Sequence, residues 1–455
     1  MKNVALHNLG CKVNSYELEV MQQKLREKGY NIVSFDEVAD IYIINTCTVT
    51  NIADRKSRQM LHRAKQKNPA AVVVAVGCYV QSGLDAIEKD DSIDLAIGNN
   101  RKKDIVEILE EYLVSREDKT LGGTTILDIN HTHDYEEMQL KQTAEHTRAY
   151  IKIQDGCNQF CSYCAIPLAR GRVRSRRTED ILREIQGMVA AGYREVVLTG
   201  IHISSYGVDF DQTPGEQGGS KLIDLIEQIH TTEGLERIRL GSLEPRIITA
   251  ETAERLAALP KLCPHFHLSL QSGCDTTLIR MNRHYTTGEY YESVEQLRRV
   301  FDHPAITTDV IVGFPGETEE EFIQTRKFLE KVGFYEMHIF KYSRRNGTAA
   351  AKMPNQVSEE VKADRSRALF ELEHRQSREF RSRYIGRNAE VLLEETKSIQ
   401  GKAYHLGHTR DYVKLAIPQN GTETGSGRLE TVAVKEFLAD DILLAELGVT
   451  CKVDV

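Results

Sequence analysis

The sequence lacks any hydrophobic run long enough to cross a membrane. Its longest apolar stretch, AAVVVAV at residues 70–76, is far too short for a spanning helix, so a membrane protein is excluded. The N-terminal segment MKNVALHNLG also lacks the basic segment, apolar core and small-residue cleavage site of a signal peptide. We therefore expect a cytoplasmic protein with no membrane partner.

Positive charge is not in excess either. The 455 residues include 59 Lys plus Arg against 67 Asp plus Glu, for a net charge of −8. A uniformly basic protein is excluded, and any RNA-binding surface must be a local basic patch. The length predicts two or three domains, and the composition, 40% hydrophobic and 28% charged, is globular.

Cysteines are few and odd in number, nine in the whole chain. A chain of this length does not need disulfides to replace a small core, so this count favours a metal or redox role over a disulfide framework.

The pattern of apolar runs predicts an α/β fold in three parts. In residues 1–120, short runs such as IYIINTC and AVVVAVGC alternate with amphipathic stretches, which is typical of a doubly wound α/β domain with a parallel sheet. Residues 118–147 are polar and aperiodic, and we expect a linker there. Residues 142–375 contain six further βα units, which predict a partial (β/α)6 barrel with its working face at the C-terminal strand ends. The short strands of residues 384–455 predict a small β-barrel.

Three cysteines stand within one short loop, DGCNQFCSYCAIP at residues 155–167. Cys157, Cys161 and Cys164 follow the expected first barrel strand with the spacing C-x3-C-x2-C. Three thiolates can hold a four-iron cluster and leave one iron without a protein ligand. The alternative is a tetrahedral zinc site, but zinc normally takes four ligands in paired knuckles, and no second cysteine pair lies nearby in the sequence.

A second group of cysteines is spread over the first domain. Cys11, Cys47 and Cys78 each come just after a strand-like run, so a parallel sheet would bring all of them to the same edge. Taken singly they could be buried small hydrophobes. Their equivalent placement favours a second cluster, whereas Cys263, Cys274 and Cys451 fit no such pattern and are expected to be structural.

The cysteine loop, with Tyr163 before its last cysteine, resembles the cluster motif of radical S-adenosylmethionine (SAM) enzymes. Together with GCKVNSYE, NTCTVT and the small C-terminal barrel, the chain resembles the methylthiotransferases over nearly its whole length. The resemblance implies two [4Fe-4S] clusters, one held by each cysteine group, with SAM as methyl donor and radical source. It also implies that the six cysteines are the catalytic and metal-binding residues and that the last barrel is a TRAM RNA-binding domain.

Within that family, the motifs GCKVNSYELE, PLARGRVRSR, HLSLQSGCD and FKYSRRNGTAA look most like the threonylcarbamoyladenosine branch. That branch replaces the C2 hydrogen of N6-threonylcarbamoyladenosine, at tRNA position 37 next to the anticodon, with a methylthio group. The implied partners are the tRNA anticodon stem-loop, an electron donor and a sulfur donor. The alternatives are the same chemistry on isopentenyladenosine tRNA or a ribosomal protein, or a non-catalytic iron–sulfur protein that binds RNA.

Strand-end residues on the barrel face are the candidates for SAM binding, with Tyr163 near the adenine. The set comprises Tyr163, Thr199, Gly200, Ser242, Glu244, Ser269, Gln271 and Gly313. The segment GFPGET, which contains Gly313, could instead be only a tight turn into a helix.

Arginines crowd the segment RGRVRSRR just after the cysteine loop. Because guanidinium groups suit phosphates and exposed bases, we expect Arg170, Arg172, Arg174 and Arg176 to include the RNA-binding residues. The alternative is a solvated charged face, paired with residues such as Glu179. His202, His265 and His267 lie on or near strands, where we expect packing residues with satisfied hydrogen bonds.

Overall fold

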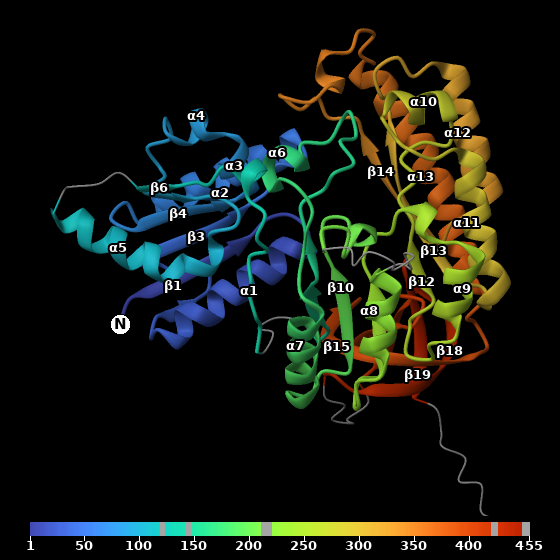
Figure 1. Ribbon diagram of the computed structural model, residues 1–455. Coiled ribbons are helices and arrows are strands. Elements are labelled where there is room, and N and C mark those ends of the chain that lie inside the picture. Colours follow the sequence, from blue (N-terminus) through green and yellow to red (C-terminus); the bar gives the residue numbers. More distant parts are fainter. Residues whose placement is uncertain (119–122, 142–146, 211–220, 420–425, 448–455) are drawn as a thin grey trace, which may run out of the picture.

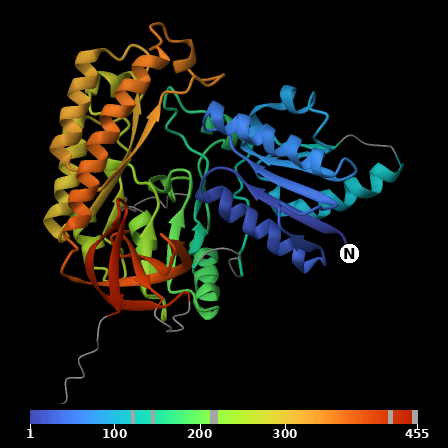
Figure 2. The same cartoon turned by 180° about the vertical axis from the view of Figure 1, so that it is seen from behind.

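The computed structural model describes residues 1–118, 123–141, 147–210, 221–419 and 426–447 (Figure 1). The chain forms an N-terminal α/β layer, a partial barrel of parallel strands and a small closed β-barrel. The N-terminal layer lies to one side of the partial barrel, and the closed barrel lies at its base; the view from behind shows the same arrangement (Figure 2). The predicted fold class is therefore confirmed.

The N-terminal layer is a six-stranded parallel sheet in the order β2-β1-β3-β4-β5-β6. Its central strands β3 and β4 are buried at every position, which explains why they read as continuous apolar runs. The strands are β1 Asn3–Asn8, β2 Asn31–Val33, β3 Ile41–Thr46, β4 Val72–Gly77, β5 Leu95–Ile97 and β6 Gly123–Thr125. The helices are α1 Lys12–Glu27, α2 Asn51–Lys67, α3 Cys78–Ser82, α4 Leu84–Ile87, the short η1 Lys102–Asp104, and α5 Ile105–Asp118.

The predicted linker is irregular over most of its described residues but contains two short elements, which refines the prediction. Its residues 123–125 form β6, the edge strand of the first sheet, and 129–131 form the short helix η2. Further along, Met138 and Leu140 are buried in the main core. A three-residue strand and isolated apolar contacts have no period that a sequence pattern could reveal. Residues 119–122 and 142–146 of this stretch lie outside the described residues.

Six parallel strands form the partial barrel. They make two sheets, β7-β10-β11 and β12-β13-β14, and the parallel bridges Ile238↔Leu262 and Leu243↔Leu268 join the two. The strands are β7 Ala149–Lys152, β10 Glu195–Thr199, β11 Arg237–Leu240, β12 His265–His267, β13 Ala305–Val312 and β14 Glu336–Lys341. A short antiparallel pair, β8 Gln154–Asp155 and β9 Arg174–Ser175, follows the first strand.

Helices between these strands cover the outside of the barrel, with α11, α12 and α13 side by side in both views (Figures 1 and 2). Three of them, α9, α11 and α12, start with a threonine N-cap in a capping box, which satisfies free backbone N–H groups. The helices are α6 Ile166–Arg170, α7 Thr178–Ala190, η3 Ile203–Ser205, α8 Lys221–His230, η4 Pro245–Ile247, α9 Ala250–Ala257, α10 Asp275–Arg280, α11 Thr287–Val300, α12 Glu319–Val332, η5 Ala350–Lys352 and α13 Glu359–Ser382.

The C-terminal unit is a closed barrel in the order β15-β16-β17-β19-β18. Its strands are β15 Asn388–Ile399, β16 Lys402–Thr409, β17 Lys414–Pro418, β18 Leu429–Ala439 and β19 Ile442–Leu447. Arginines of β11 fix it to the partial barrel: Arg237 pairs with Glu390 at 2.7 Å, and Arg239 donates to the Arg410 carbonyl at 2.8 Å. Among the described residues, no helix combines the length and apolar character needed to cross a membrane.

A buried carboxylate joins the N-terminal layer to the partial barrel. Glu17 of α1 forms ion pairs with Lys102, with Lys152 at 2.7 Å and with Arg170 at 2.8 Å. Burial alone raises the pKa of Glu17, but the cations Arg170, Lys102 and Lys152 hold it well below its usual range. The two units are thus held by a charged network that is closed to water.

Candidate active site

The first cysteine loop starts at a glycine that no other residue could replace without a shift of the chain. Gly156 has φ +70°, and a Cβ there would lie 1.7 Å from the carbonyl oxygen of Arg172. This close approach lets the Cys157 amide donate to the Gly171 carbonyl at 3.0 Å. The loop and the segment that follows it are therefore held together at their base.

The middle of the loop is anchored to the end of α10. The Ser162 hydroxyl donates to the Arg280 carbonyl at 2.8 Å, and the Ser162 amide donates to the Met281 carbonyl at 3.0 Å. The side-chain amide of Asn282 donates to the Phe160 carbonyl at 3.0 Å. These bonds fix the backbone between Cys157 and Cys164, so the cysteines are presented by a rigid loop.

The three thiols of this loop are a donor set that fits a metal cluster. Burial raises the pKa of Cys157, and burial together with the charge of Cys161 raises the pKa of Cys164 to about 12. A bound cation would lower these pKa values, because it favours the thiolate form that serves as ligand. Arg283 donates from Nη1 to the sulfur of Cys161 at 3.2 Å, which supplies positive charge to a sulfur ligand.

The second cysteine group lies at the carboxyl edge of the first sheet, as predicted from strand order. Cys11, Cys47 and Cys78 follow β1, β3 and β4. Gly10, with φ +116°, leaves room for the Cys47 sulfur, which would lie 3.2 Å from a Cβ at that position. Burial raises the pKa of Cys47 to about 11, and the charges of Cys78 and Cys11 act in the same direction because these thiols are neighbours.

The surroundings of this second group also fit a cluster. The Asn99 side-chain amide donates to the Cys78 sulfur at 3.5 Å and to the Ala169 carbonyl at 2.6 Å. Three neighbouring sulfurs, one of which accepts a side-chain hydrogen bond, match the ligand chemistry of iron–sulfur clusters. The remaining described cysteines, Cys263 and Cys274, are buried, and Cys451 lies outside the described residues.

A cavity of about 310 Å³ lies beside the first cysteine group. Its lining includes all three cysteines of the loop and, from the N-terminal unit, Val49 and Thr50, which follow Cys47 closely in the chain. The complete lining is Val49, Thr50, Cys157, Gln159, Cys161, Tyr163, Cys164, Ile166, Ile201, His202, Ser242, Leu243, Glu244, Ser269, Gln271, Arg283, Asp309, Ile311, Phe340, Lys341, Tyr342 and Ser343.

Part of the predicted SAM set faces this cavity. Tyr163, Ser242, Glu244, Ser269 and Gln271 line it.

The other members of the predicted set lie outside the lining. Thr199 is buried, and its carbonyl accepts from the Ile153 amide at 2.9 Å. Gly200 packs against Gln154, and Gly313 is a turn glycine whose amide donates to Glu317 at 2.6 Å. The positive φ of Gly313, +70°, agrees with a tight turn, and its role in SAM binding stays a prediction.

Sequence reasoning missed several lining residues, among them Ile201, His202, Arg283, Asp309 and Ile311. Strand alternation could have found two of them, because Asp309 and Ile311 lie two positions apart on β13 and so share a face. Arg283 lies in a turn after α10, and no sequence pattern marks it.

The arginine segment behaves differently from the prediction. Arg170, Arg174 and Arg176 are at most 1% exposed, so in this structure none of them offers a surface to RNA. Arg176 pairs with Glu137 at 2.5 Å and also with Glu184.

Arg170 contacts both Glu17 and Asp155, and it lies near the second cysteine group. Burial lowers its pKa, but Asp155, Cys78 and Glu17 raise it well above the usual value. Arg170 and Arg176 are structural because each pairs with buried carboxylates, and the pair between Arg170 and Glu17 also joins the two units. Arg172 alone of the four predicted arginines is exposed.

The histidines also depart from the expectation of satisfied packing residues. His202 lines the cavity, and His202, His265 and His267 each keep one buried ring nitrogen without a hydrogen-bond partner among the described residues. Burial lowers the pKa of His202 to about 4, so its imidazole is neutral at physiological pH.

The fold and the two cysteine groups define a class of protein: a partial-barrel enzyme that holds iron–sulfur clusters. Comparisons with known proteins agree. Residues 151–329 match the radical SAM superfamily, and residues 3–98 match a family described as Uncharacterized protein family UPF0004.

Full-length relatives give the family. The chain is 39% identical to threonylcarbamoyladenosine tRNA methylthiotransferase MtaB of Bacillus subtilis (strain 168), over 95% of this chain and 94% of that protein. It is 35% identical to tRNA-2-methylthio-N(6)-dimethylallyladenosine synthase of Methylacidiphilum infernorum (isolate V4), over 92% of this chain and 90% of that protein. The chain therefore belongs to the family of tRNA methylthiotransferases.

A solved structure supports the fold. The radical SAM methyltransferase TsrM of Kitasatospora setae, solved with cobalamin and a [4Fe-4S] cluster, superposes with a TM-score of 0.55 at 15% identity. The match covers 77% of this chain and 74% of TsrM.

Proposed function

We propose that the protein replaces the C2 hydrogen of N6-threonylcarbamoyladenosine at position 37 of tRNA with a methylthio group. One observation carries the proposal: a single cavity is lined by Cys157, Cys161 and Cys164 of the first cysteine group and by Val49 and Thr50, which closely follow Cys47 of the second. A base held there would lie beside the first group and against the segment that carries Cys47. Sulfur insertion needs such a site, with one centre to activate the carbon and another to deliver the sulfur.

The reaction calls for cofactor chemistry. The C2 hydrogen of adenine is not acidic, so an acid–base pair cannot remove it. When bound, SAM and the two [4Fe-4S] clusters supply the radical, the methyl group and the sulfur. The six cysteines, Cys11, Cys47, Cys78, Cys157, Cys161 and Cys164, are the proposed ligands, three for each cluster.

The chain's own residues bind, orient and shield. Ile201, Ile311 and Leu243 make part of the cavity wall apolar, which keeps water away from a reactive species. Ser269 and Gln271, on alternate positions after β12, and Glu244 line the cavity with polar groups that would hydrogen-bond the amino, carboxylate or ribose groups of SAM. Tyr163 would offer its aromatic ring to the adenine of SAM.

Exposed apolar and aromatic side chains give the RNA a surface to contact. Phe160 is 43% exposed, and the Arg172 guanidinium lies over its ring at 4.4 Å from the centroid. Phe340 and Val49, which line the cavity, are 46% and 52% exposed. Splayed-out bases stack on aromatic rings and on guanidinium planes, so these residues suit the single-stranded loop of an anticodon stem-loop.

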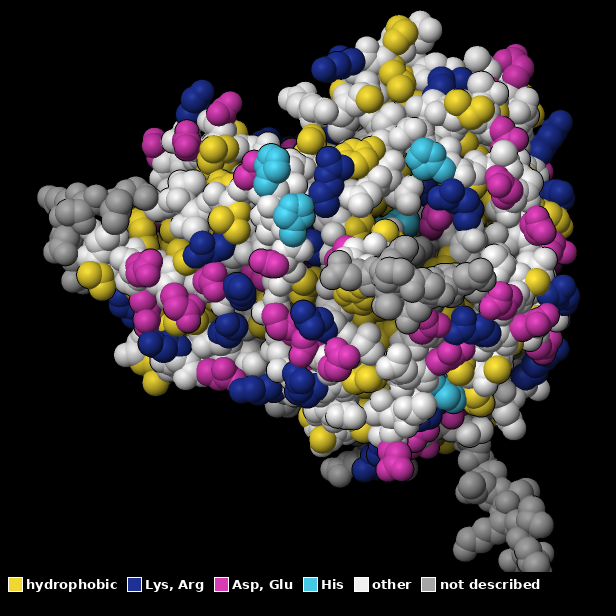
Figure 3. All heavy atoms as spheres, in the orientation of Figure 1, with side chains coloured by type: hydrophobic (Ala, Val, Ile, Leu, Met, Phe, Trp, Pro, Cys, Tyr) yellow, Lys and Arg dark blue, Asp and Glu magenta, His cyan; other side chains and the backbone are white. Residues whose placement is uncertain are grey.

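Charge alone does not mark an RNA-binding face. On the face in Figure 3, Lys and Arg side chains are interspersed with Asp and Glu side chains. Residues 388–455 hold 7 Lys plus Arg and 11 Asp plus Glu, which gives −4 for the C-terminal barrel. We propose that this barrel acts as a TRAM domain that contacts RNA by shape and stacking, and that Arg172 supplies a phosphate contact near the cavity.

The proposed reaction also needs partners outside the chain. A reductant must supply electrons to the cluster of the barrel loop, and a sulfur donor must renew the sulfur that each turnover consumes. A tRNA substrate and these soluble donors fit a cytoplasmic enzyme.

The test is anaerobic incubation of the reconstituted protein with SAM, sulfide, a strong reductant and tRNA that carries N6-threonylcarbamoyladenosine. Nucleosides from the digested tRNA are then analysed by mass spectrometry, with isopentenyladenosine tRNA as a parallel substrate. We expect the methylthio product from the first tRNA only. Product from the second tRNA alone would overturn the proposed substrate. No product from either tRNA, with both clusters intact, would overturn the proposed activity.

A further inference from the structure

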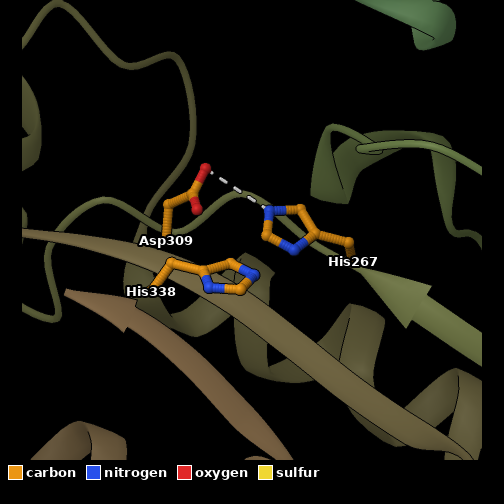
Figure 4. A group of neighbouring side chains, drawn as sticks. All are labelled: His267, Asp309 and His338. Atoms are coloured by element: carbon orange, nitrogen blue, oxygen red, sulfur yellow. Dashed lines mark ion pairs between the residues drawn. The ribbon is translucent and has the colours of Figure 1, made fainter. Parts of the chain in front are cut away.

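Three metal-ligating side chains meet on the barrel face outside the two cysteine groups. His267 of β12, Asp309 of β13 and His338 of β14 each offer one ligand atom, and these atoms all lie within 4.8 Å of one another. The imidazoles and the carboxylate turn toward a common space (Figure 4). Asp309 also lines the cavity beside Cys157, Cys161 and Cys164.

Strand register brings these side chains together. Asp309 and His338 are direct partners in the parallel pair β13–β14, and His267 is the partner of Thr307 in the pair β12–β13. The rings of His267 and His338 are stacked, with centroids 5.7 Å apart and planes at 26°. The cluster therefore rests on three hydrogen-bonded strands, and such strands hold ligands more precisely than loops do.

The contact between His267 and Asp309 is poorly explained as an ion pair alone. The Nε2 atom of His267 lies 3.4 Å from Asp309 Oδ2, whereas charge-assisted N–H···O bonds are about 2.7–2.9 Å long. Nε2 is buried and has no hydrogen-bond partner among the described residues.

The separation does fit two ligands of one metal ion. Zinc bonds to histidine nitrogen and carboxylate oxygen of about 2.05 Å place neighbouring ligands of a tetrahedron about 3.4 Å apart.

The second nitrogen of His267 is arranged as in metal sites. Its Nδ1 lies 3.0 Å from the hydroxyl oxygen of Thr307, which can accept the Nδ1 proton. In that tautomer Nε2 carries a free lone pair directed at Asp309 and His338. Metal-binding histidines almost always use the other ring nitrogen in this way, which fixes the ring and the tautomer.

We propose that His267, Asp309 and His338 form a binding site for a divalent transition metal ion of the zinc type, separate from both cysteine groups. Two imidazoles and a carboxylate suit zinc or ferrous iron rather than magnesium or calcium, which prefer oxygen ligands. Three protein ligands leave one tetrahedral position for water or for an oxygen of a bound molecule. The site depends on the barrel strands and not on the methylthio reaction.

The test measures zinc on the cluster-loaded protein. After equilibrium dialysis with radioactive zinc, zinc and iron per chain are counted, and X-ray absorption at the zinc edge identifies the ligands. We expect one zinc per chain with nitrogen and oxygen neighbours at about 2.0–2.1 Å. Sulfur neighbours at about 2.3 Å would mean zinc bound to cysteines and would overturn the proposal.

Variants separate this site from other binding. His338→Ala, at an exposed position, should weaken zinc binding at least about tenfold and leave the iron content unchanged. Thr307→Val removes only the hydroxyl group that contacts Nδ1 of His267, and it should also weaken zinc binding. His303→Ala is the matched control, because His303 is another exposed histidine beside an aspartate, with its Nε2 3.8 Å from Asp302. Zinc retained equally by His338→Ala and His303→Ala would overturn the proposal.

Discussion

The Arg283 guanidinium donates a hydrogen bond to the sulfur of Cys161 at 3.2 Å. Its Nε also donates to the Tyr285 hydroxyl at 3.0 Å, so the guanidinium is held in place from two directions. A buried cation beside a sulfur ligand stabilises negative charge there. Arg283 is therefore placed to tune the electron affinity of whatever the Cys157 loop binds.

Replacing this arginine tests that role. Arg283→Gln removes a charged hydrogen bond of about 1.5–3 kcal/mol. We expect a more negative cluster potential and SAM cleavage at least about tenfold slower with a weak reductant. Redox titration by electron paramagnetic resonance gives the potential.

Arg326→Gln, on the surface of α12, is the control for this experiment. A stronger reductant should restore much of the rate of Arg283→Gln. If the stronger reductant does not restore the rate and the cluster potential is unchanged, redox tuning by Arg283 is contradicted. Its role would then be structural only.

The two cysteine groups should fail in different ways. Cys157→Ala should abolish 5′-deoxyadenosine formation, because the barrel loop would lose one of the three proposed cluster ligands. Cys47→Ala should retain SAM cleavage and lose sulfur insertion. Chromatography of 5′-deoxyadenosine and mass spectrometry of the tRNA nucleosides measure the two outcomes, and full product from either variant would refute the assignment.

Neighbouring arginines should separate stability from RNA binding. Arg170→Met leaves the buried carboxylates Glu17 and Asp155 with one cation fewer, and we expect the free energy of unfolding to fall by about 3–5 kcal/mol. Arg172 is the exposed arginine of this segment, so Arg172→Gln should change the free energy of unfolding by less than about 0.5 kcal/mol. Urea denaturation under anaerobic conditions measures both.

Arg172→Gln should in turn weaken tRNA binding and reduce its salt dependence, as expected for the loss of one phosphate contact. Filter binding at several salt concentrations measures this. Unchanged tRNA affinity would remove Arg172 from the proposed RNA surface.

His202 should make stability depend on pH in the acid range. Burial lowers its folded-state pKa to about 4, against about 6.5 in the unfolded chain. Between these values the unfolded chain binds more protons, so stability rises with pH from about 4 to 6.5 and falls on acidification. His202→Gln should flatten this dependence. Anaerobic urea denaturation at pH 5.5 and 7.5 compares the two proteins, and equal slopes would rule the histidine out as the source.

Sequence patterns predicted the strands and the placement of the cysteines because both follow from chain order. Cys11, Cys47 and Cys78 come to one edge since the strands before them are parallel neighbours. The fate of the arginines could not be predicted in this way. Arg170 and Arg176 are buried because Glu17, Glu137 and Glu184, all distant in the sequence or on another element, fold against them.

The same limit applies to the cavity. Arg283 and Asp309 reach it from a turn and a strand far from the cysteine loop, and no local pattern records that meeting. Strand β6, within the predicted linker, could not be predicted for a different reason: its three residues are too few to show a period.

The buried position of Glu17 bears on how far the chain is modular. The first sheet and the partial barrel look like exchangeable units, each with its own alternation of strands and helices. Yet one carboxylate of the first unit neutralises Lys152 and Arg170 of the second. If the first unit were excised, this carboxylate would be exposed and would lack two of its cations. If the first unit were exchanged with that of a relative, unpaired charge would be buried at the junction unless the pairing cations were exchanged as well. The units can therefore be exchanged only together with the residues that neutralise each other across their junction.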